Sequence, residues 1–152
     1  MNEYHVVDLT PQPTAVVRAT VPMGELPAFF ARAFSAVWSL LSTQGVAVAG
    51  APLGLYLSEP GETVELEAGF PVGGSFTPSG EVIASALPGG RVVATMHVGP
   101  YDTMHKTYDG MLSWMKSRGM TPGTTMWEVY LSDPQKEPDP AKWQTMLYWP
   151  ST

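Results

Sequence analysis

One acidic residue, Glu128, lies in a segment that is otherwise apolar and aromatic, Trp127-Glu128-Val129-Tyr130. Successive side chains of a strand point to opposite faces, so Glu128 would share its face with Met126 and Tyr130, while Trp127 and Val129 point away. Both faces are therefore expected to be at least partly buried. Because no basic residue is near in sequence, a buried Glu128 would have a raised pKa or need a cationic ligand. The alternative is an ordinary exposed glutamate at a sheet edge, since glutamate is rarely buried without a partner.

Aromatic side chains are the second chemical signal. The chain has five Trp, six Tyr and five Phe, more large rings than core filling requires. Two of them, Tyr101 and Tyr108, share one face of a predicted helix, and the last two predicted strands carry four more: Trp127, Tyr130, Tyr148 and Trp149. Rings around a carboxylate can bind flat, lipophilic cations through stacking and cation–π attraction. For any single ring, packing in the core is the alternative.

Other catalytic and metal-binding patterns are weak. His97 and His105 lie on either side of a predicted strand-to-helix boundary and His5 is remote from both, so spacing assembles no metal site. No serine stands in a G-x-S-x-G turn, and no glycine-rich phosphate loop follows a strand. The absence of cysteine excludes disulfides, thiolate ligands and thiol catalysis. We expect no metal and no cofactor.

Charge and hydropathy restrict the class of partner. Eight Lys and Arg against fourteen Asp and Glu give a net charge of -6, and there is no basic run. Nucleic-acid binding needs clustered cations, so we expect no nucleic-acid partner for this chain alone. No apolar segment approaches the roughly 18 residues that span a bilayer, and no signal peptide is visible. The expectation is a folded, cytoplasmic protein without a membrane partner; its oligomeric state stays open.

The residues with chemistry need a scaffold, and the sequence predicts eight strands and two helices. Predicted strands occupy residues 4–9, 15–21, 53–57, 64–72, 81–86, 92–98, 125–131 and 145–149, the first two forming a hairpin. The first predicted helix runs from Glu25 to a stop at Gly45, and the second from Pro100 to a stop at Gly119. These elements predict an α+β fold with a mainly antiparallel sheet.

An internal repeat indicates how the elements are arranged. Residues 15–20 resemble residues 91–96, and Trp38 aligns with Trp114, both at an offset of 76; the segment from Tyr56 to Pro60 matches that from Tyr130 to Pro134 at an offset of 74. We expect one domain, 1–152, made of halves 1–74 and 75–152 that are related by an approximate two-fold axis. Trp38 and Trp114 should then occupy equivalent sites, and the groove on the axis is a natural ligand site.

Several motifs, taken in order, resemble the gyrase-inhibitor-like (GyrI-like) small-molecule-binding superfamily. The most specific are H-x-G-P-Y-D, from His97 to Asp102, and E-x-Y, from Glu128 to Tyr130. Further matches occur at residues 67–72, 86–90 and 142–145, so the resemblance covers essentially the whole chain. It implies a tandem duplication of a β-α-β-β (SHS2-like) unit, and a central pocket in which an acidic residue at the position of Glu128 lies among aromatic rings.

The resemblance leaves two functions open. The family includes effector domains of multidrug-responsive transcription activators, stand-alone binders and a branch that hydrolyses reactive cyclopropane-containing genotoxins; this chain shows no helix-turn-helix segment. The first hypothesis is a binder of lipophilic, often cationic, aromatic compounds for sensing or sequestration. Its candidate ligand-binding residues are Glu128, Tyr130, Tyr101, Tyr108, Trp38, Trp114, Phe70, Tyr148 and His97. The second is a hydrolase in which Glu128 activates water and Tyr130 or Tyr101 donates a proton. Unrelated roles, such as inhibition of another protein or haem binding through His97, are further alternatives.

Overall fold

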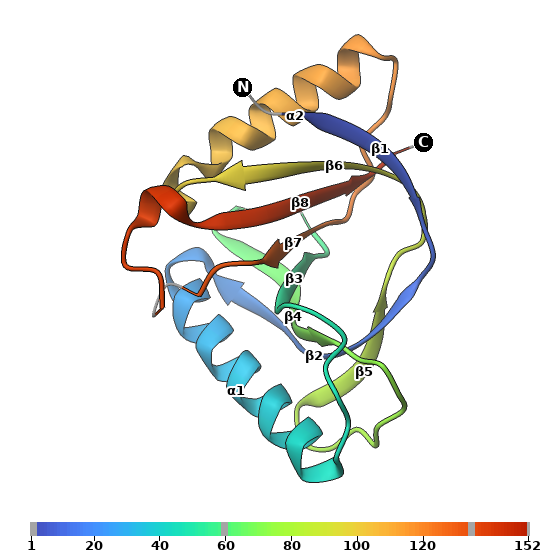
Figure 1. The fold of residues 1–152 in the computed structure, drawn as a ribbon, viewed down its shortest axis with the longest axis vertical. Helices are drawn as coiled ribbons and strands as arrows, with labels where there is room; N and C mark the ends of the chain where they lie inside the picture. The colour runs from blue at the N-terminus through green and yellow to red at the C-terminus, as the bar shows by residue number, and fades with distance from the viewer. Residues whose placement is uncertain (1–2, 59–60, 134–135, 152) are drawn as a thin grey trace.

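The computed structural model describes residues 3–58, 61–133 and 136–151; Glu59, Pro60 and Pro134 of the repeated segment lie outside them. It contains eight strands and two α-helices, with short 3₁₀ turns η1 and η2 at the starts of the helices (Figure 1). The elements are β1 (Tyr4–Leu9), β2 (Gln12–Pro22), η1 (Met23–Glu25), α1 (Leu26–Gln44), β3 (Leu53–Tyr56), β4 (Thr63–Pro71), β5 (Val82–Leu87), β6 (Gly90–Val98), η2 (Tyr101–Thr103), α2 (Met104–Ser117), β7 (Met126–Tyr130), η3 (Pro140–Lys142) and β8 (Gln144–Pro150). The predicted α+β class, with an antiparallel sheet and two main helices, is confirmed.

All the strands join one sheet in the order β1-β6-β8-β7-β3-β4-β2-β5, and every pairing is antiparallel. The predicted hairpin of the first two strands is wrong: β1 pairs with β6, whereas β2 pairs with β4 and β5. Tight hairpin loops need residues with positive φ, and the connector Thr10-Pro11 supplies neither glycine nor any such residue. Each half of the sequence therefore gives its first strand to the other half.

Both helices pack on the same face of this sheet, α1 against β2 and β4 and α2 against β6 (Figure 1). Helix α1 buries a stripe at four-residue spacing: Phe29, Ala33, Val37 and Leu41. Helix α2 buries the matching stripe Met104, Thr107, Met111 and Met115. Each helix is followed by a left-handed glycine, Gly45 and Gly119, both at φ 69°, a conformation that glycine adopts without steric cost.

The strand pairings give the repeat a different offset from the one read in the sequence. Gln12 pairs with Leu87, and Leu9 pairs with Gly90. An offset of 78 matches Gln12 to Gly90 and Leu9 to Leu87, so it converts one pair into the other. The buried stripes of the helices follow the same offset. The predicted equivalence of Trp38 and Trp114, at 76, is therefore wrong, because a slip of two residues turns a helix position by about 200°.

The face of the sheet away from the helices carries a second core. There Trp127 stacks on Tyr148, with ring centroids 5.1 Å apart, and packs with Leu53 and Leu55. The connectors β1–β2 and β5–β6 meet at the edge of this core, since a Cβ on Gly89 would lie 2.6 Å from Cδ of Pro11. No helix in the described part of the chain is long and apolar enough to cross a membrane.

Candidate functional site

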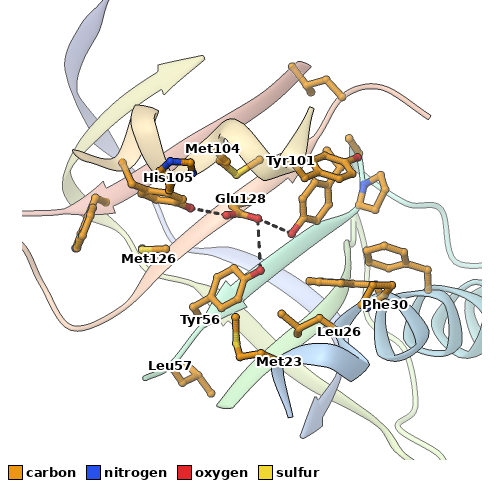
Figure 2. Close-up of a pocket in the computed structure, with 18 of the residues that line it drawn as sticks. Met23, Leu26, Phe30, Tyr56, Leu57, Tyr101, Met104, His105, Met126 and Glu128 are labelled. Atoms are coloured by element: carbon orange, nitrogen blue, oxygen red, sulfur yellow. Dashed lines mark hydrogen bonds between the residues drawn. The ribbon is translucent and has the colours of Figure 1, made fainter. Parts of the chain in front are cut away.

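A large cavity lies between the two helices, over the central strands β3 and β7 (Figure 2). Its volume is about 1790 Å³, above the about 300–1,000 Å³ that is usual for small-molecule sites. Helix α1 supplies one wall and α2 with η2 the other, while Tyr56, Met126 and Glu128 come from the central strands. Alternation along β7 turns Met126, Glu128 and Tyr130 to the cavity and Trp127 to the opposite core, as the sequence predicted.

The Glu128 carboxylate is the polar centre of this cavity, and three tyrosine hydroxyls donate to it (Figure 2). Tyr108 donates to Oε2 at 2.5 Å, and Tyr130 donates to Oε1 at 2.7 Å. Tyr56 donates to Oε1 at 3.5 Å. The donors come from α2, β7 and β3, so both halves of the repeat hold the same carboxylate.

The electrostatics of Glu128 combine burial with hydrogen bonding. Glu128 is only 6% exposed. This burial raises the pKa of Glu128 above its ordinary value, although the hydrogen bonds from the three tyrosine hydroxyls lower it. Burial and the neighbouring carboxylate hold the pKa values of Tyr108 and Tyr130 well above the usual range. Among the residues that the structure describes, no Lys, Arg or His forms an ion pair with Glu128.

The two helical walls differ in chemistry. The α1 wall is apolar and aromatic: Leu26, Pro27, Phe30, Ala31, Phe34 and Trp38. The α2 wall mixes apolar with polar groups: Tyr101, Met104, His105, Tyr108, Asp109 and Leu112. Ring contacts tie the walls to the floor, with Tyr130 edge-on to Phe30 at 5.6 Å and to Tyr101 at 6.1 Å.

Five of the nine predicted ligand-binding residues line the cavity: Glu128, Tyr130, Tyr101, Tyr108 and Trp38. The other four do not. Phe70 is 9% exposed and supports the α1 wall from behind, where its ring meets Phe34 and Trp38. Tyr148 points to the opposite core, because it pairs with Trp127 and cross-strand partners share a face.

Trp114 and His97 also lie away from the cavity. Trp114 stacks on Tyr4 of β1 and packs against the core beneath α2, and the Arg118 guanidinium lies 4.4 Å from the centroid of its ring. His97 is buried beneath the start of α2: Nδ1 lies 2.7 Å from the Thr107 hydroxyl and Nε2 lies 2.9 Å from the Pro100 carbonyl. His97 thus holds the turn that carries Tyr101.

Sequence reasoning missed several residues of the cavity. Tyr56 was available from the repeat itself, as the residue matched to Tyr130. Trp149 could be predicted from the alternation of side chains along β8, because its neighbour Tyr148 points away from the cavity. Phe30 and Phe34 follow the apolar spacing of the helix, and only the packing shows that they face the cavity while Phe29 faces the sheet.

Residues 2–151 match the family model of the GyrI-like small molecule binding domain. The chain belongs to this family. No curated protein matches the sequence.

Solved structures share the GyrI-like fold of this chain. The C-terminal domain of EcmrR has a TM-score of 0.84 at 18% identity, with 100% of this chain and 98% of that domain covered. An EcmrR chain in a DNA complex gives the same TM-score and identity over 99% of this chain, which spans 57% of that longer one. A hydrolase from Listeria innocua is also similar, with a TM-score of 0.68 at 19% identity over 99% of this chain and 92% of that one. SAV2435 bound to tetraphenylphosphonium has a TM-score of 0.69 at 13% identity over 99% of this chain and 94% of that one.

The chemistry open to this GyrI-like site follows from its side chains. A carboxylate offers about four acceptor positions, and three are used by tyrosines, so Glu128 can still meet one further donor or a positive charge. No cluster of three or more His, Asp or Glu that could hold a metal ion occurs among the described residues. Charge attraction, ring stacking and proton transfer are what these groups provide.

Proposed function

We propose that the cavity binds lipophilic aromatic cations, for sensing or sequestration, with Glu128 as the opposing charge. The observation that carries the proposal is a carboxylate, 6% exposed, that faces a large cavity without an ion-pair partner among the described residues. A buried charge is costly unless it is paired, and a cationic ligand would supply the missing pair.

The walls suit the remainder of such a ligand. Tyr101, Tyr130 and Phe30 present rings near the carboxylate, where they can stack on aromatic groups and attract positive charge. The tyrosine hydroxyls are already directed at Glu128, so ligand selection would rest on shape, apolar contact and charge. The similar structure of SAV2435 was determined with tetraphenylphosphonium, a cation of this class.

Matched cationic and neutral compounds test the proposal. Calorimetric titration with methyltriphenylphosphonium should give tight binding, and the neutral triphenylphosphine oxide should bind at least tenfold more weakly. In Glu128→Gln this preference should be lost, whereas Glu62→Gln, at an exposed residue outside the cavity, should behave as wild type. Equal affinity for the two compounds, or an unchanged preference in Glu128→Gln, would refute a role for the carboxylate.

The second candidate is hydrolysis of reactive cyclopropane-containing compounds. It is favoured by the raised pKa of Glu128, which makes the carboxylate a better general base, and by the adjacent tyrosine hydroxyls. Glu128 would take a proton from a water molecule as the water oxygen bonds to a carbon of the cyclopropane ring. The ring C–C bond at that carbon would break, and Tyr130 or Tyr101 would donate a proton to the group that receives its electron pair. A new hydrated product, detected by mass spectrometry and absent with Glu128→Gln, would favour this function; bound but unaltered compound would favour the receptor.

A further inference from the structure

An aromatic ridge extends along α1 from the carboxylate toward the open rim of the cavity. Phe30, Phe34 and Trp38 recur every four residues, which places them on one side of the helix, and all three line the cavity. Exposure increases along the ridge: Phe30 and Phe34 are half-buried, and Trp38 is 54% exposed. An exposed tryptophan at the end of an apolar row marks a surface whose burial by another apolar group would be favourable in free energy.

The ridge is continuous with the charged centre. Phe30 meets Tyr130 at 5.6 Å, Phe34 meets Phe30 at 5.6 Å, and Phe70 behind them bridges Phe34 and Trp38 at 5.8 and 5.7 Å. Tyr130 in turn donates to Glu128. From Phe30 to Trp38 the helix rises about 12 Å, at about 1.5 Å per residue.

Helix α2 offers no equivalent row. At the offset of 78, Phe34 corresponds to Leu112 and Trp38 to Lys116, and Lys116 is absent from the cavity wall. The cavity is therefore one-sided, with its apolar length along α1 and its polar groups along α2. Its volume of about 1790 Å³ exceeds what one compact aromatic cation fills.

We propose that the ridge Phe30–Phe34–Trp38 is a subsite for the apolar tail of amphiphilic cations, with Trp38 as the residue that selects for tail length. This rests on the proposed binding of cations at Glu128 and names their shape: a compact aromatic cationic head at the carboxylate and an extended apolar arm along α1. No part of the arm needs hydrogen-bonding groups, because the ridge residues offer only carbon surface and the indole edge of Trp38.

A series of alkyltriphenylphosphonium ions with methyl, butyl, octyl and dodecyl tails tests the subsite, by calorimetric titration below the micelle concentration of each compound. A fully buried methylene is worth about a fourfold gain in affinity, so about twofold per methylene is expected on a half-open ridge. The gain should level off once the tail exceeds the about 12 Å of the ridge. In Trp38→Ala the octyl compound should lose about tenfold in affinity and the methyl compound less than twofold, and Trp38→Phe should recover part of the loss.

Trp114→Ala is the matched control, because Trp114 stacks on Tyr4 and does not line the cavity. The dependence of affinity on tail length in this variant should equal that of wild type. Two outcomes would overturn the subsite alone. In the first, the methyl compound binds but affinity does not increase with tail length; in the second, affinity increases with tail length and Trp38→Ala leaves that increase unchanged. Absence of binding by the methyl compound, or binding indifferent to Glu128→Gln, would overturn the proposed function and the subsite with it. Circular dichroism of each variant verifies folding.

Discussion

Gly54 and Glu128 lie directly opposite each other in the antiparallel pair of β3 and β7. They are also equivalent positions of the repeat, because the offset of 74 that matches Tyr56 to Tyr130 matches Gly54 to Glu128. Two residues that are both partners and equivalents must flank the approximate two-fold axis, which passes between them. The carboxylate is thus placed next to the axis, at the centre of the cavity.

The difference between these two residues has an electrostatic reason. Directly paired residues have Cα atoms about 4.5–5.5 Å apart, so a glutamate in both copies would bring two buried carboxylates together and force one to remain protonated. Glycine at position 54 avoids this and leaves room, since a Cβ there would lie 3.0 Å from both Cε1 of Phe30 and the hydroxyl of Tyr130. The symmetric scaffold therefore holds a single charge.

Gly54→Ala should weaken binding more than it weakens the fold. The added methyl would displace Phe30 and Tyr130, so affinity for methyltriphenylphosphonium should fall about tenfold, while overpacking costs on the order of 1 kcal/mol of unfolding free energy. Calorimetry and urea denaturation measure the two effects. Gly73→Ala, whose Cβ would enter open space, is the control. Unchanged affinity in Gly54→Ala would show that the contact does not position Tyr130.

Tyr108→Phe should move the pH dependence of cation binding upward. Cations bind the ionised form of Glu128, so affinity falls as pH decreases through the pKa of that carboxyl, which burial already holds above its ordinary value. The lost hydrogen bond, about 1.5–3 kcal/mol for a charged acceptor, corresponds to a rise of about one to two pH units. Titrations from pH 4 to 9 measure the midpoint. Tyr148→Phe, on the opposite face, should keep the wild-type midpoint, and coincident midpoints for all three proteins would contradict the role of Tyr108.

Much of the scaffold could be predicted from local sequence patterns. Alternation placed Glu128 and Tyr130 on one face of β7, and helix periodicity with glycine stops gave both helices within a few residues. These features depend on neighbours along the chain. The pairing of β1 with β6 does not, because it joins segments from different halves, and nothing in the Thr10-Pro11 connector indicates which strand β1 will meet.

The site was harder to predict because it depends on register. A shift of two residues in the repeat made Trp38 and Trp114 look equivalent, although one lines the cavity and the other stacks on Tyr4. Similar residue types recur at an offset of 76, whereas the pairings of β1 with β6 and of β2 with β5 set an offset of 78 for this part of the repeat. In the same way, one residue along β8 decides whether Tyr148 or Trp149 faces the cavity, and only the strand register settles it.

His97→Gln should loosen the α2 wall without removing any residue from the cavity. The Pro100 carbonyl can only accept, which assigns the imidazole proton to Nε2 and leaves Nδ1 to accept from Thr107. Loss of this bridge should cost about 1–2 kcal/mol of unfolding free energy and several-fold in cation affinity. Because α2 carries Tyr108, whose hydroxyl lowers the pKa of Glu128, a looser α2 wall should also raise the pH midpoint of binding.

Two readings separate positioning by His97 from a general loss of stability. Amide exchange should accelerate at residues 101–107 more than in β2 or β4, and the binding midpoint should move while that of His5→Gln, at an exposed histidine, stays fixed. Uniform acceleration of exchange with an unmoved midpoint would leave His97 with a structural role only.

Glu128→Gln should stabilise the unliganded protein at high pH. A carboxyl whose folded pKa is raised contributes stability that is fully present below its unfolded pKa, near 4.5, and is lost as pH rises through the folded value. Glutamine has no charge to bury, and its carbonyl can still accept from Tyr130. At pH 8 the unfolding free energy of the variant should therefore exceed that of wild type by about 1.4 kcal/mol for each unit by which the folded pKa is raised. This difference should shrink toward pH 4. Urea denaturation across this pH range measures the difference, with Glu62→Gln as the exposed control. If Glu128→Gln were less stable than wild type at pH 8, the tyrosine hydroxyls would compensate the buried charge completely, and no ligand would be needed to neutralise it.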